Sequence, residues 1–406
     1  MNQLFHALGI HELYPHQEPP LKAARKGRDI FVRFPTSSGK SLLGQIPALE
    51  DNTGYSIVIS PLLALQKDQM DKLSALGLSV YCLNSAMTAS TREDLLEQMS
   101  KGMQCTLIYM APEQLLKEDV QKALAGGSCR RIIVDEAHMV LHASKKYRPA
   151  FKRIGEVIDK LPYKPQIIAL TATATPSDIQ KIKRLLRCPD AELFSLPVRR
   201  ENLCVDMVEL HGKDRQQRLC QAVLDRLNKK ELTGKAIIYC RTRADTKAVY
   251  RFLKGRKYKA VRIHGGTGRK SREKRQNKFV RGAANIMVAT TAFGLGIDIP
   301  DIRLIIHAGL PLTFDGYIQE IGRAGRDGKP ADCCLIYHNG DFGRNENILA
   351  TGKKSRKKAK RQVAFMKKAV ESSTCLWQIV DKHFKDHKDR PCGRCPACRR
   401  KALHHR

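Results

Sequence analysis

Short apolar runs rich in β-branched residues recur along the chain and alternate with polar or amphipathic stretches. Runs of about four to six residues that are apolar at nearly every position are typical of strands buried on both faces, as in parallel sheets covered by helices. The pattern predicts two series of such strands. They are Asp29–Phe34, Ser56–Ser60, Cys105–Met110, Arg131–Val134 and Ile167–Leu170, then Ala236–Cys240, Ala260–Ile263, Ile286–Ala289, Leu304–His307 and Cys333–Tyr337.

The two series predict an α/β fold with two domains in tandem, each a parallel sheet covered by helices. The series are joined around Leu196–Asn202, so we expect the domains to span residues 1–198 and 199–344. Ligands are expected at the carboxyl ends of the strands, where parallel sheets bind them. The remaining residues, 345–406, are predicted to form a smaller helical segment.

The third segment begins with a basic run, Lys353–Arg361, in which seven of nine residues are Lys or Arg. Such a run can bind phosphate backbones, act as a nuclear localisation signal or form the solvated face of a helix. The sequence leaves these three interpretations open. A helical stretch is predicted from about Gln362 to Phe384, followed by a short Cys-rich end.

The net charge of +33 is far from that of an ordinary globular protein, although the hydrophobic content of 42% is not. This excess indicates a polyanionic partner, most simply nucleic acid. A basic protein without such a partner is the alternative. No apolar run approaches the roughly 20 residues of a membrane helix, and Met1–Gln17 holds no sustained apolar stretch. We therefore expect no membrane association and no signal peptide, and an intracellular location: the nucleus in a eukaryote, the cytoplasm or nucleoid in a bacterium.

Residues Pro35–Ser41 read Pro-Thr-Ser-Ser-Gly-Lys-Ser between a predicted strand and a helical stretch. This context favours a phosphate-binding loop, in which backbone N–H groups and a helix N-terminus hold the phosphates of ATP. Lys40 would reach the β- and γ-phosphates, and Ser41 would bind Mg²⁺. Phe34 occupies the position of the first glycine in the usual loop pattern. The loop residues expected to bind the nucleotide are Thr36, Ser37, Ser38, Gly39, Lys40 and Ser41.

Two carboxylates, Asp135 and Glu136, directly follow a predicted strand and open the run Asp-Glu-Ala-His. An acidic pair at the carboxyl end of a strand suits Mg²⁺ and the water that attacks the γ-phosphate. We expect Asp135 to hold the metal and Glu136 to position or polarise the water; a solvated acidic turn is the alternative. Gln17 carries an amide that can donate and accept, which suits adenine, although a lone Gln is more often a surface residue. Thr171–Thr173 is expected to link the acidic pair to the neighbouring domain through hydroxyls, or to cap a helix.

The run Gln319–Gly328 reads Gln-Glu-Ile-Gly-Arg-Ala-Gly-Arg-Asp-Gly. Its glycines clear space, and the guanidinium groups of Arg323 and Arg326 match phosphate oxygens in bidentate fashion. The run lies far in sequence from the loop at Pro35–Ser41. If both serve one nucleotide, we expect that nucleotide between two lobes that open and close.

Four of the thirteen cysteines lie near the end of the sequence with the spacing C-x16-C-x2-C-x2-C. Thiolates at this spacing can complete a tetrahedral Zn²⁺ site, and four Cys ligands leave no open position, as in structural rather than catalytic zinc sites. Disulfides are the alternative, which an intracellular chain disfavours. The expected ligands are Cys375, Cys392, Cys395 and Cys398.

These pieces, in this order, resemble superfamily 2 helicases and, more narrowly, the RecQ family. The resemblance extends from about Leu8 to Cys398, nearly the whole sequence. The matching stretches are Ser60–Met70 (motif Ia), Leu83–Ser85, Tyr109–Glu113, Asp135–His138 (the DEAH form of motif II), Val288–Asp298 (motif V) and Gln319–Arg326 (motif VI). The cysteine spacing also matches the zinc-binding subdomain of that family.

The resemblance implies two RecA-like domains and an ATP-dependent DNA helicase or translocase, with 3′ to 5′ polarity, acting on single-stranded or forked DNA in repair and recombination. It implies that Gln319 and Arg323 face the nucleotide and that Arg326 is an arginine finger. Asp298, with Thr290 and Thr291, would couple the nucleotide to the DNA. Near the adenine, where the family usually has a Tyr and an Arg, this chain has Ile10 and Tyr14, and we expect Tyr14 to stack on the adenine instead. The protein is expected to be a monomer, and no protein partner is indicated.

The chain also departs from the family. The family's aromatic-rich loop after the DEAH box carries a Trp that senses single-stranded DNA, and this position falls at Ala143, followed by Lys145, Lys146 and Tyr147. The sequence stops soon after the cysteine cluster, so we expect a minimal core without winged-helix or C-terminal helical domains. These departures motivate an alternative function, a nucleic-acid-binding accessory protein with a weak or uncoupled ATPase.

Overall fold

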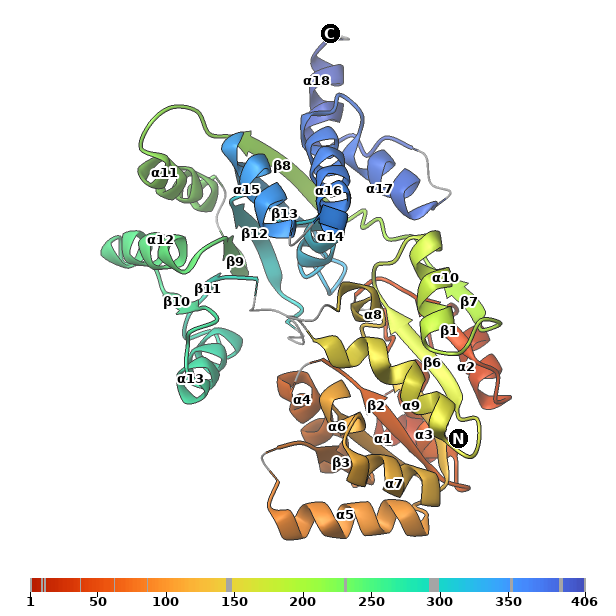
Figure 1. Ribbon diagram of the computed structural model, residues 1–406. Coiled ribbons are helices and arrows are strands. Elements are labelled where there is room, and N and C mark those ends of the chain that lie inside the picture. The colour runs from red at the N-terminus through yellow and green to blue at the C-terminus, as the bar shows by residue number, and fades with distance from the viewer. Residues whose placement is uncertain are drawn as a thin grey trace. The chain divides into compact units, whose positions relative to one another are not determined.

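The computed structural model describes most of the 406 residues and divides them into two compact units, Met1–Val198 and Arg199–Arg406. Each unit can be followed by colour in Figure 1. None of the described helices is long and apolar enough to cross a membrane. The described residues are 2–8, 10, 12–36, 38–61, 63–85, 87–143, 148–229, 232–291, 299–350, 353–386 and 390–404.

The first unit is built on a seven-stranded parallel sheet with the strand order β3-β4-β2-β5-β6-β1-β7. Strand β1 lies between β6 and β7, so that Ile30 is in register with Ile168 on one side and Glu192 on the other. The strands are β1 (Ile30–Arg33), β2 (Tyr55–Ile59), β3 (Val80–Leu83), β4 (Thr106–Met110), β5 (Cys129–Val134), β6 (Gln166–Thr171) and β7 (Glu192–Ser195).

Helices cover both faces of this sheet, because consecutive strand residues enter two separate hydrophobic clusters. Ile57 and Ile132 pack in one cluster, whereas their neighbours Val58 and Ile133 pack in the other. Both faces are therefore buried, as the continuous apolar runs predict. The helices are α1 (Asn2–Ala7), α2 (Glu18–Arg25), α3 (Leu42–Glu50), α4 (Leu63–Ala75), α5 (Ala89–Lys101), α6 (Pro112–Leu115), α7 (Glu118–Gly126), α8 (Met139–His142), η1 (Pro149–Arg153), α9 (Ile154–Lys160) and α10 (Pro176–Leu185).

The second unit is built on a six-stranded parallel sheet with the order β10-β11-β9-β12-β13-β8. Its strands are β8 (Leu203–Glu209), β9 (Lys235–Cys240), β10 (Ala260–Ile263), β11 (Ile286–Ala289), β12 (Ile302–Ala308) and β13 (Ala331–Tyr337). Its helices are α11 (Arg215–Asn228), α12 (Arg243–Gly255), α13 (Arg269–Val280), α14 (Phe314–Ile321), α15 (Gly340–Leu349), α16 (Lys353–Glu371), α17 (Leu376–Phe384) and α18 (Pro396–His404).

The predicted fold class is confirmed, and all ten predicted strands are present within a residue or two of their expected bounds. Three further strands, β3, β7 and β8, were not predicted, and each lies at the edge of its sheet. An edge strand has only one neighbouring strand and is partly exposed, so it lacks a continuous apolar run. Strand β7, for example, alternates between half-buried and exposed positions.

The prediction of one helical stretch from Gln362 to Phe384 is wrong in detail. Helix α16 begins earlier, at Lys353, and ends at Glu371, and a separate helix, α17, begins at Leu376. Between them the hydroxyl of Ser372 accepts a hydrogen bond from the backbone N–H of Thr374 at 2.9 Å. Side-chain hydrogen bonds of this kind compete with helix continuation, and the break places Cys375 directly before α17.

Candidate nucleotide site and cysteine cluster

The loop between β1 and α3 has the geometry of a phosphate-binding loop. Gly39 adopts φ +74°, the left-handed conformation that glycine tolerates best. The carbonyl of Pro35 accepts hydrogen bonds from the hydroxyl of Ser38 at 2.7 Å and from the ammonium of Lys40 at 2.9 Å. Ser41 is the N-terminal cap residue of α3. The N-terminal end of α3 therefore follows directly on Lys40, as anion binding by a helix N-terminus requires.

Gln17 supports this loop from outside. Its side chain is buried and donates through Nε2 to the carbonyl of Ser38 at 3.2 Å, while Oε1 accepts from the backbone N–H of Tyr14 at 2.9 Å. A Cβ at Gly39 would lie 2.1 Å from the same Nε2 atom, so any larger residue would displace the Gln17 amide from the loop. His16 also reaches the Ser38 carbonyl at 3.1 Å.

The expected contacts of Gln17 and Tyr14 with adenine stay predictions. What the structure adds is a role for Gln17 that the sequence did not indicate, namely fixing the loop. The ring of Tyr14 lies on the ring of His16, with centroids 5.4 Å apart and planes 7° apart, and Tyr14 is 59% exposed. It therefore offers its other face to solvent.

The acidic pair follows β5 at the carboxyl edge of the sheet. Asp135 continues the strand pairing through its N–H to the carbonyl of Ile59 at 2.9 Å. Glu136 has φ +50°, which is strained for a residue with a side chain, and such strain is concentrated at functional sites. Its N–H donates to Oδ1 of Asp135 at 2.9 Å. The two carboxylates are thus held in a fixed turn.

A small cavity brings together the two residues expected to bind Mg²⁺. Ser41 and Asp135 both line this cavity, which has a volume of about 20 Å³. Burial raises the pKa of Asp135 to about 7, the Glu136 carboxylate acts in the same direction, and Lys40 opposes it. A divalent cation between Ser41 and Asp135 would reverse this effect and keep Asp135 ionised. The hydroxyl and the carboxylate are the hard oxygen ligands that Mg²⁺ prefers.

Thr171 and His138 connect the acidic pair to the adjacent strand. His138 Nδ1 lies 3.0 Å from the hydroxyl of Thr171 at the end of β6, and 3.3 Å from a carboxylate oxygen of Glu136. The Thr171 hydroxyl donates to the carbonyl of Thr173 at 3.2 Å. The Thr171 hydroxyl therefore bonds within the first unit, to His138, and the expected link to the neighbouring domain stays a prediction.

In the second unit, the arginine-rich run forms the end of α14 and the turn that leads to β13. Gln319 lies on α14, Arg323 is buried, and Gly325 has φ +54°. Two residues just before β8 hold this turn. Arg200 donates through Nη2 to the carbonyl of Gly325 at 2.7 Å, and Asn202 donates through Nδ2 to the same carbonyl at 2.9 Å and to the carbonyl of Lys329 at 2.8 Å.

A buried aromatic cluster lies beside the same run. A carboxylate oxygen of Glu320 lies 2.8 Å from Nε2 of His307. The ring of His307 packs against the rings of Tyr239 and Tyr317. Burial raises the pKa of Tyr239 to about 12, and the positive charges of Arg323 and Arg326 act in the opposite direction.

Sequence reasoning did not identify Arg200, Asn202, His307 or Tyr239. Arg200 and Asn202 lie just before β8, an edge strand that was not predicted. They are more than a hundred residues from the turn that they hold. The only available signal was their place at the domain junction. Other predicted residues, Ser37 and Asp298 together with 145–147 of the loop after the DEAH box, lie outside the described residues. Ala143 is described and is buried.

The four cysteines predicted to bind zinc lie together. Ligand atoms of Cys375, Cys392, Cys395 and Cys398 are all within 4.8 Å of one another, and Sγ of Cys392 lies 3.9 Å from Sγ of Cys398. Zn–S bonds of about 2.3 Å in a tetrahedron require sulfur atoms about 3.8 Å apart. Backbone N–H groups of Arg394 and Cys395 point at Sγ of Cys392 at 3.5 and 3.3 Å. The donor set and its spacing therefore fit a tetrahedral metal ion.

Two family patterns match the chain. Residues 14–182 match the DEAD/DEAH box helicase family, and residues 214–328 match the helicase conserved C-terminal domain. Among solved structures, Dbp5 of Saccharomyces cerevisiae bound to RNA and ADP BeF3 has a TM-score of 0.66 at 18% identity, over 88% of this chain and 96% of that one. The helicase Lhr of Mycobacterium smegmatis, bound to single-stranded DNA and AMP-PNP, has a TM-score of 0.65 at 19% identity, over 93% and 54%. These likenesses establish the fold, with two RecA-like parallel-sheet domains.

Proteins with similar sequences identify the family more narrowly than the solved structures do. The ATP-dependent DNA helicase RecQ of Pasteurella multocida is 32% identical over 97% of this chain and 61% of its own length. The RecQ of Bacillus subtilis is 31% identical over 97% and 66%, and the ATP-dependent DNA helicase Q5 of Rattus norvegicus is 33% identical over 96% and 42%. The chain thus spans about three fifths of the length of its bacterial relatives. It belongs to the RecQ family of superfamily 2 helicases.

Proposed function

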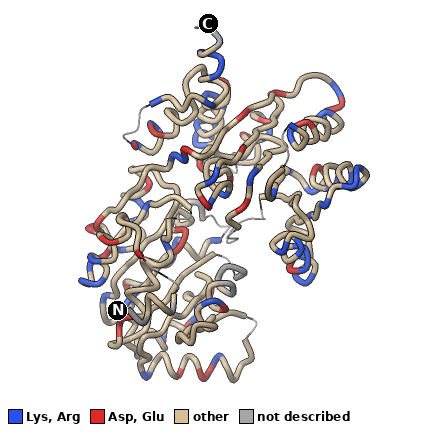
Figure 2. Tube along the Cα trace, turned by 180° about the vertical axis from the view of Figure 1, so that it is seen from behind, with Lys and Arg blue, Asp and Glu red and all other residues tan. Residues whose placement is uncertain are grey.

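We propose that this chain hydrolyses ATP and uses the energy to move 3′ to 5′ along single-stranded DNA and to unwind duplex DNA. The relatives that match nearly all of it are named ATP-dependent DNA helicases. The net charge of +33 suits a nucleic-acid substrate. Figure 2 shows Lys and Arg gathered on several helices of the second unit, among them α13, where six of twelve residues are basic.

The observation that carries the proposal is the convergence of Ser41, Asp135 and Lys40 in the first unit. Ser41 and Asp135 line one small cavity, and the charge of Lys40 acts on Asp135. Phosphoryl transfer from ATP requires a cation, oxygen ligands for Mg²⁺ and a site for the phosphates such as a helix N-terminus. Lys40, Ser41, Asp135 and the start of α3 would supply these parts. When bound, Mg²⁺ would neutralise charge on the β- and γ-phosphates.

In the proposed reaction, Lys40 and the backbone of the loop bind the phosphates, and Ser41 and Asp135 hold the metal. Glu136, fixed in its turn by the bond to Asp135, orients the attacking water and takes its proton. Gln319 and Arg323 contact the nucleotide, and Arg326 stabilises the charge that develops on the transferred phosphoryl group. Tyr14 and Gln17 are proposed to recognise the adenine, and Thr36, Ser37, Ser38 and Gly39 to line the phosphates, with Asp298 coupling the nucleotide to DNA.

The test is the ATPase rate with and without single-stranded DNA, together with unwinding of a 3′-tailed fork. We expect DNA to stimulate hydrolysis and the fork to be unwound, and both activities to be lost in Lys40→Ala and Glu136→Gln. Equal hydrolysis by the wild type and both variants would contradict the site assignment. Strong DNA binding with no stimulation and no unwinding would instead favour the accessory function.

We also propose that the cysteine cluster holds a structural Zn²⁺ ion in a subdomain over residues 345–406. Four thiolates leave no position for substrate, and a metal ion would join the start of α17 to the turn before α18. We expect about one zinc per chain by elemental analysis, and a lowered melting temperature after chelation or in Cys395→Ser. A metal-free chain with unchanged melting temperature would contradict the assignment.

A further inference from the structure

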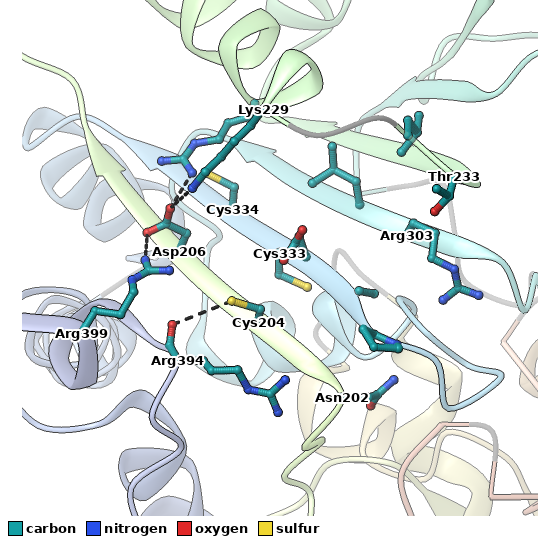
Figure 3. Close-up of a pocket in the computed structure, with 16 residues that line it drawn as sticks. Asn202, Cys204, Asp206, Lys229, Thr233, Arg303, Cys333, Cys334, Arg394 and Arg399 are labelled. Carbon is teal, nitrogen blue, oxygen red and sulfur yellow. Dashed lines mark hydrogen bonds and ion pairs between the residues drawn. The ribbon is translucent and has the colours of Figure 1, made fainter. Parts of the chain in front are cut away.

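A cavity of about 430 Å³ lies in the second unit at the side of β8, next to the turn of the arginine-rich run, because its lining residues Asn202 and Arg303 bond to Gly325 and Asp327 of that turn. Figure 3 shows side chains from four parts of the fold converging on it: β8, the end of α11, the start of β12 and β13, and the segment around α18. It is lined by Asn202, Cys204, Asp206, Arg226, Lys229, Leu232, Thr233, Arg303, Leu304, Pro330, Ala331, Asp332, Cys333, Cys334, Arg394 and Arg399.

The lining is strongly cationic. Five Lys and Arg side chains face two carboxylates, so the cavity carries an excess of three positive charges. Asp206 of β8 lies at the centre of the cluster and accepts from Arg226 at 2.5 Å and from Arg399 at 2.6 Å, with Lys229 at 3.8 Å (Figure 3). Burial tends to raise the pKa of Asp206, but Arg226 and Arg399 outweigh it and hold this pKa below its usual range. Asp206 therefore stays ionised and balances only one of the three cations around it.

Two cationic groups of the cavity have fewer hydrogen-bond acceptors than they can bind. Arg303 donates through Nη2 to Asp327, whereas its Nη1 atom is buried and has no hydrogen-bond partner among the described residues. Lys229, with 58% of its side chain exposed, is too far from Asp206 for a hydrogen bond. An anion in the cavity would supply an acceptor for the Lys229 ammonium.

Much of the remaining lining is apolar. Leu304, Ala331 and Pro330 contribute carbon surface, and Cys333 and Cys334 contribute thiols whose pKa values are raised by burial, so that they remain neutral. Pockets for small ligands span roughly 300–1,000 Å³ and combine an apolar lining with a few polar groups. The size and the lining match a compact organic molecule that carries a group with two negative charges.

We propose that this cavity binds a small organic phosphate monoester, with the phosphate among Lys229, Arg394 and Arg399 and the organic part against the apolar lining. A phosphate monoester carries about −1.5 to −2 charges at pH 7 and offers three acceptor oxygens, which suits a cavity lined by five cationic side chains. Asn202, which lines the cavity, also holds the turn of the arginine-rich run through Gly325. The bound molecule would therefore contact a residue that positions this run.

The test is isothermal titration of the full-length protein with phenyl phosphate and, separately, with inorganic phosphate. We expect saturable binding of one phenyl phosphate per chain at the cavity and weaker binding of inorganic phosphate, which cannot use the apolar lining. The variant Lys229→Met/Arg394→Gln should weaken phenyl phosphate roughly tenfold or more, since it removes two charge-assisted contacts. Cys204→Phe, which fills the cavity and keeps its charges, should weaken binding as well.

A matched control removes the same charges from exposed positions of the second unit, Lys270→Met/Arg251→Gln, and should leave the affinity unchanged. Lys40→Ala should also leave it unchanged, which separates the cavity from the proposed ATP site. Absence of saturable binding, an equal loss in either control, or inorganic phosphate binding as tightly as phenyl phosphate would each overturn the proposal. Circular dichroism and zinc content check that Arg394→Gln, close to the cysteine cluster, leaves the fold intact.

Discussion

The phosphate-binding loop of the first unit and the arginine-rich turn of the second are held in different ways. The loop is fixed mainly by neighbours in sequence: Lys40 and Ser38 donate to Pro35, and Gln17 lies about twenty residues away. The turn is fixed by Arg200 and Asn202, about 120 residues away. The first depends on local backbone geometry, and the second on the assembly of a whole sheet.

The two regions are therefore vulnerable to substitution at different kinds of residue. A loop held locally tolerates distant changes but not a change in its own backbone conformation. Gly39 illustrates this, because it has φ +74° and the Gln17 amide occupies the space that a Cβ would need. A turn held from a distant strand is vulnerable at residues that contain no motif signal. The following predictions test this contrast.

The largest effect is expected at Arg326. If it is the arginine finger, Arg326→Ala removes the charge that stabilises the transferring phosphoryl group, and turnover should fall by about 10³–10⁵. ATP affinity should change much less, because the effect belongs to the transition state. Single-turnover hydrolysis and equilibrium binding of a fluorescent ATP analogue measure the two quantities. Arg281→Ala, an exposed arginine of the same unit, is the control, and a loss of affinity as large as the loss of rate would rule out the finger role.

Glu136→Gln should reduce turnover by about 10²–10⁴, the usual contribution of a general base. The variant keeps the shape of the side chain, and the N–H of residue 136 still reaches Asp135. Binding of ATP and DNA should therefore persist while hydrolysis stops. If hydrolysis continues within a fewfold of the wild-type rate, another group takes the proton.

Much of the first unit was predictable from sequence, because its site residues directly follow buried strands whose apolar runs are easy to recognise. Ser41 and Asp135 were assigned to one metal ion from separate motifs, and they do line one cavity. The four cysteines also lie together as their spacing predicts. In each case the chemistry is carried by residues within a short motif that can be recognised from its own sequence.

The contacts that sequence reasoning missed depend on edge strands and long-range packing. Strand β8 alternates in burial and gave no apolar run, so neither its place beside β13 nor the role of Asn202 before it could be predicted. The break between α16 and α17 likewise depends on a local hydroxyl bond at Ser372 that competes with a strong helical pattern. A role for Gln17 in holding the loop could only be seen once its amide was placed beside Gly39.

An intermediate effect is expected at Gly39. Gly39→Ala imposes a positive φ on a residue with a side chain, which costs about 1–3 kcal/mol, and places a Cβ 2.1 Å from Nε2 of Gln17. ATP affinity should fall by roughly 10- to 100-fold. In a double-mutant cycle, Gln17→Ala should relieve the steric part of this loss but not the backbone part. Strictly additive effects would show that Gln17 does not contact the loop in solution.

The smallest effect is expected at Asn202. It tests whether the turn of the second unit depends on residues that are distant in sequence. Asn202→Ala removes two hydrogen bonds to the carbonyls of Gly325 and Lys329, worth about 0.5–1.5 kcal/mol each. The turn would still be held by Arg200, so we expect roughly a tenfold fall in ATP turnover with little change in melting temperature. Asn277→Ala, an exposed asparagine on α13, should have no effect. A full-rate Asn202→Ala variant would mean that Asn202 is not needed and that Arg200 alone positions the turn.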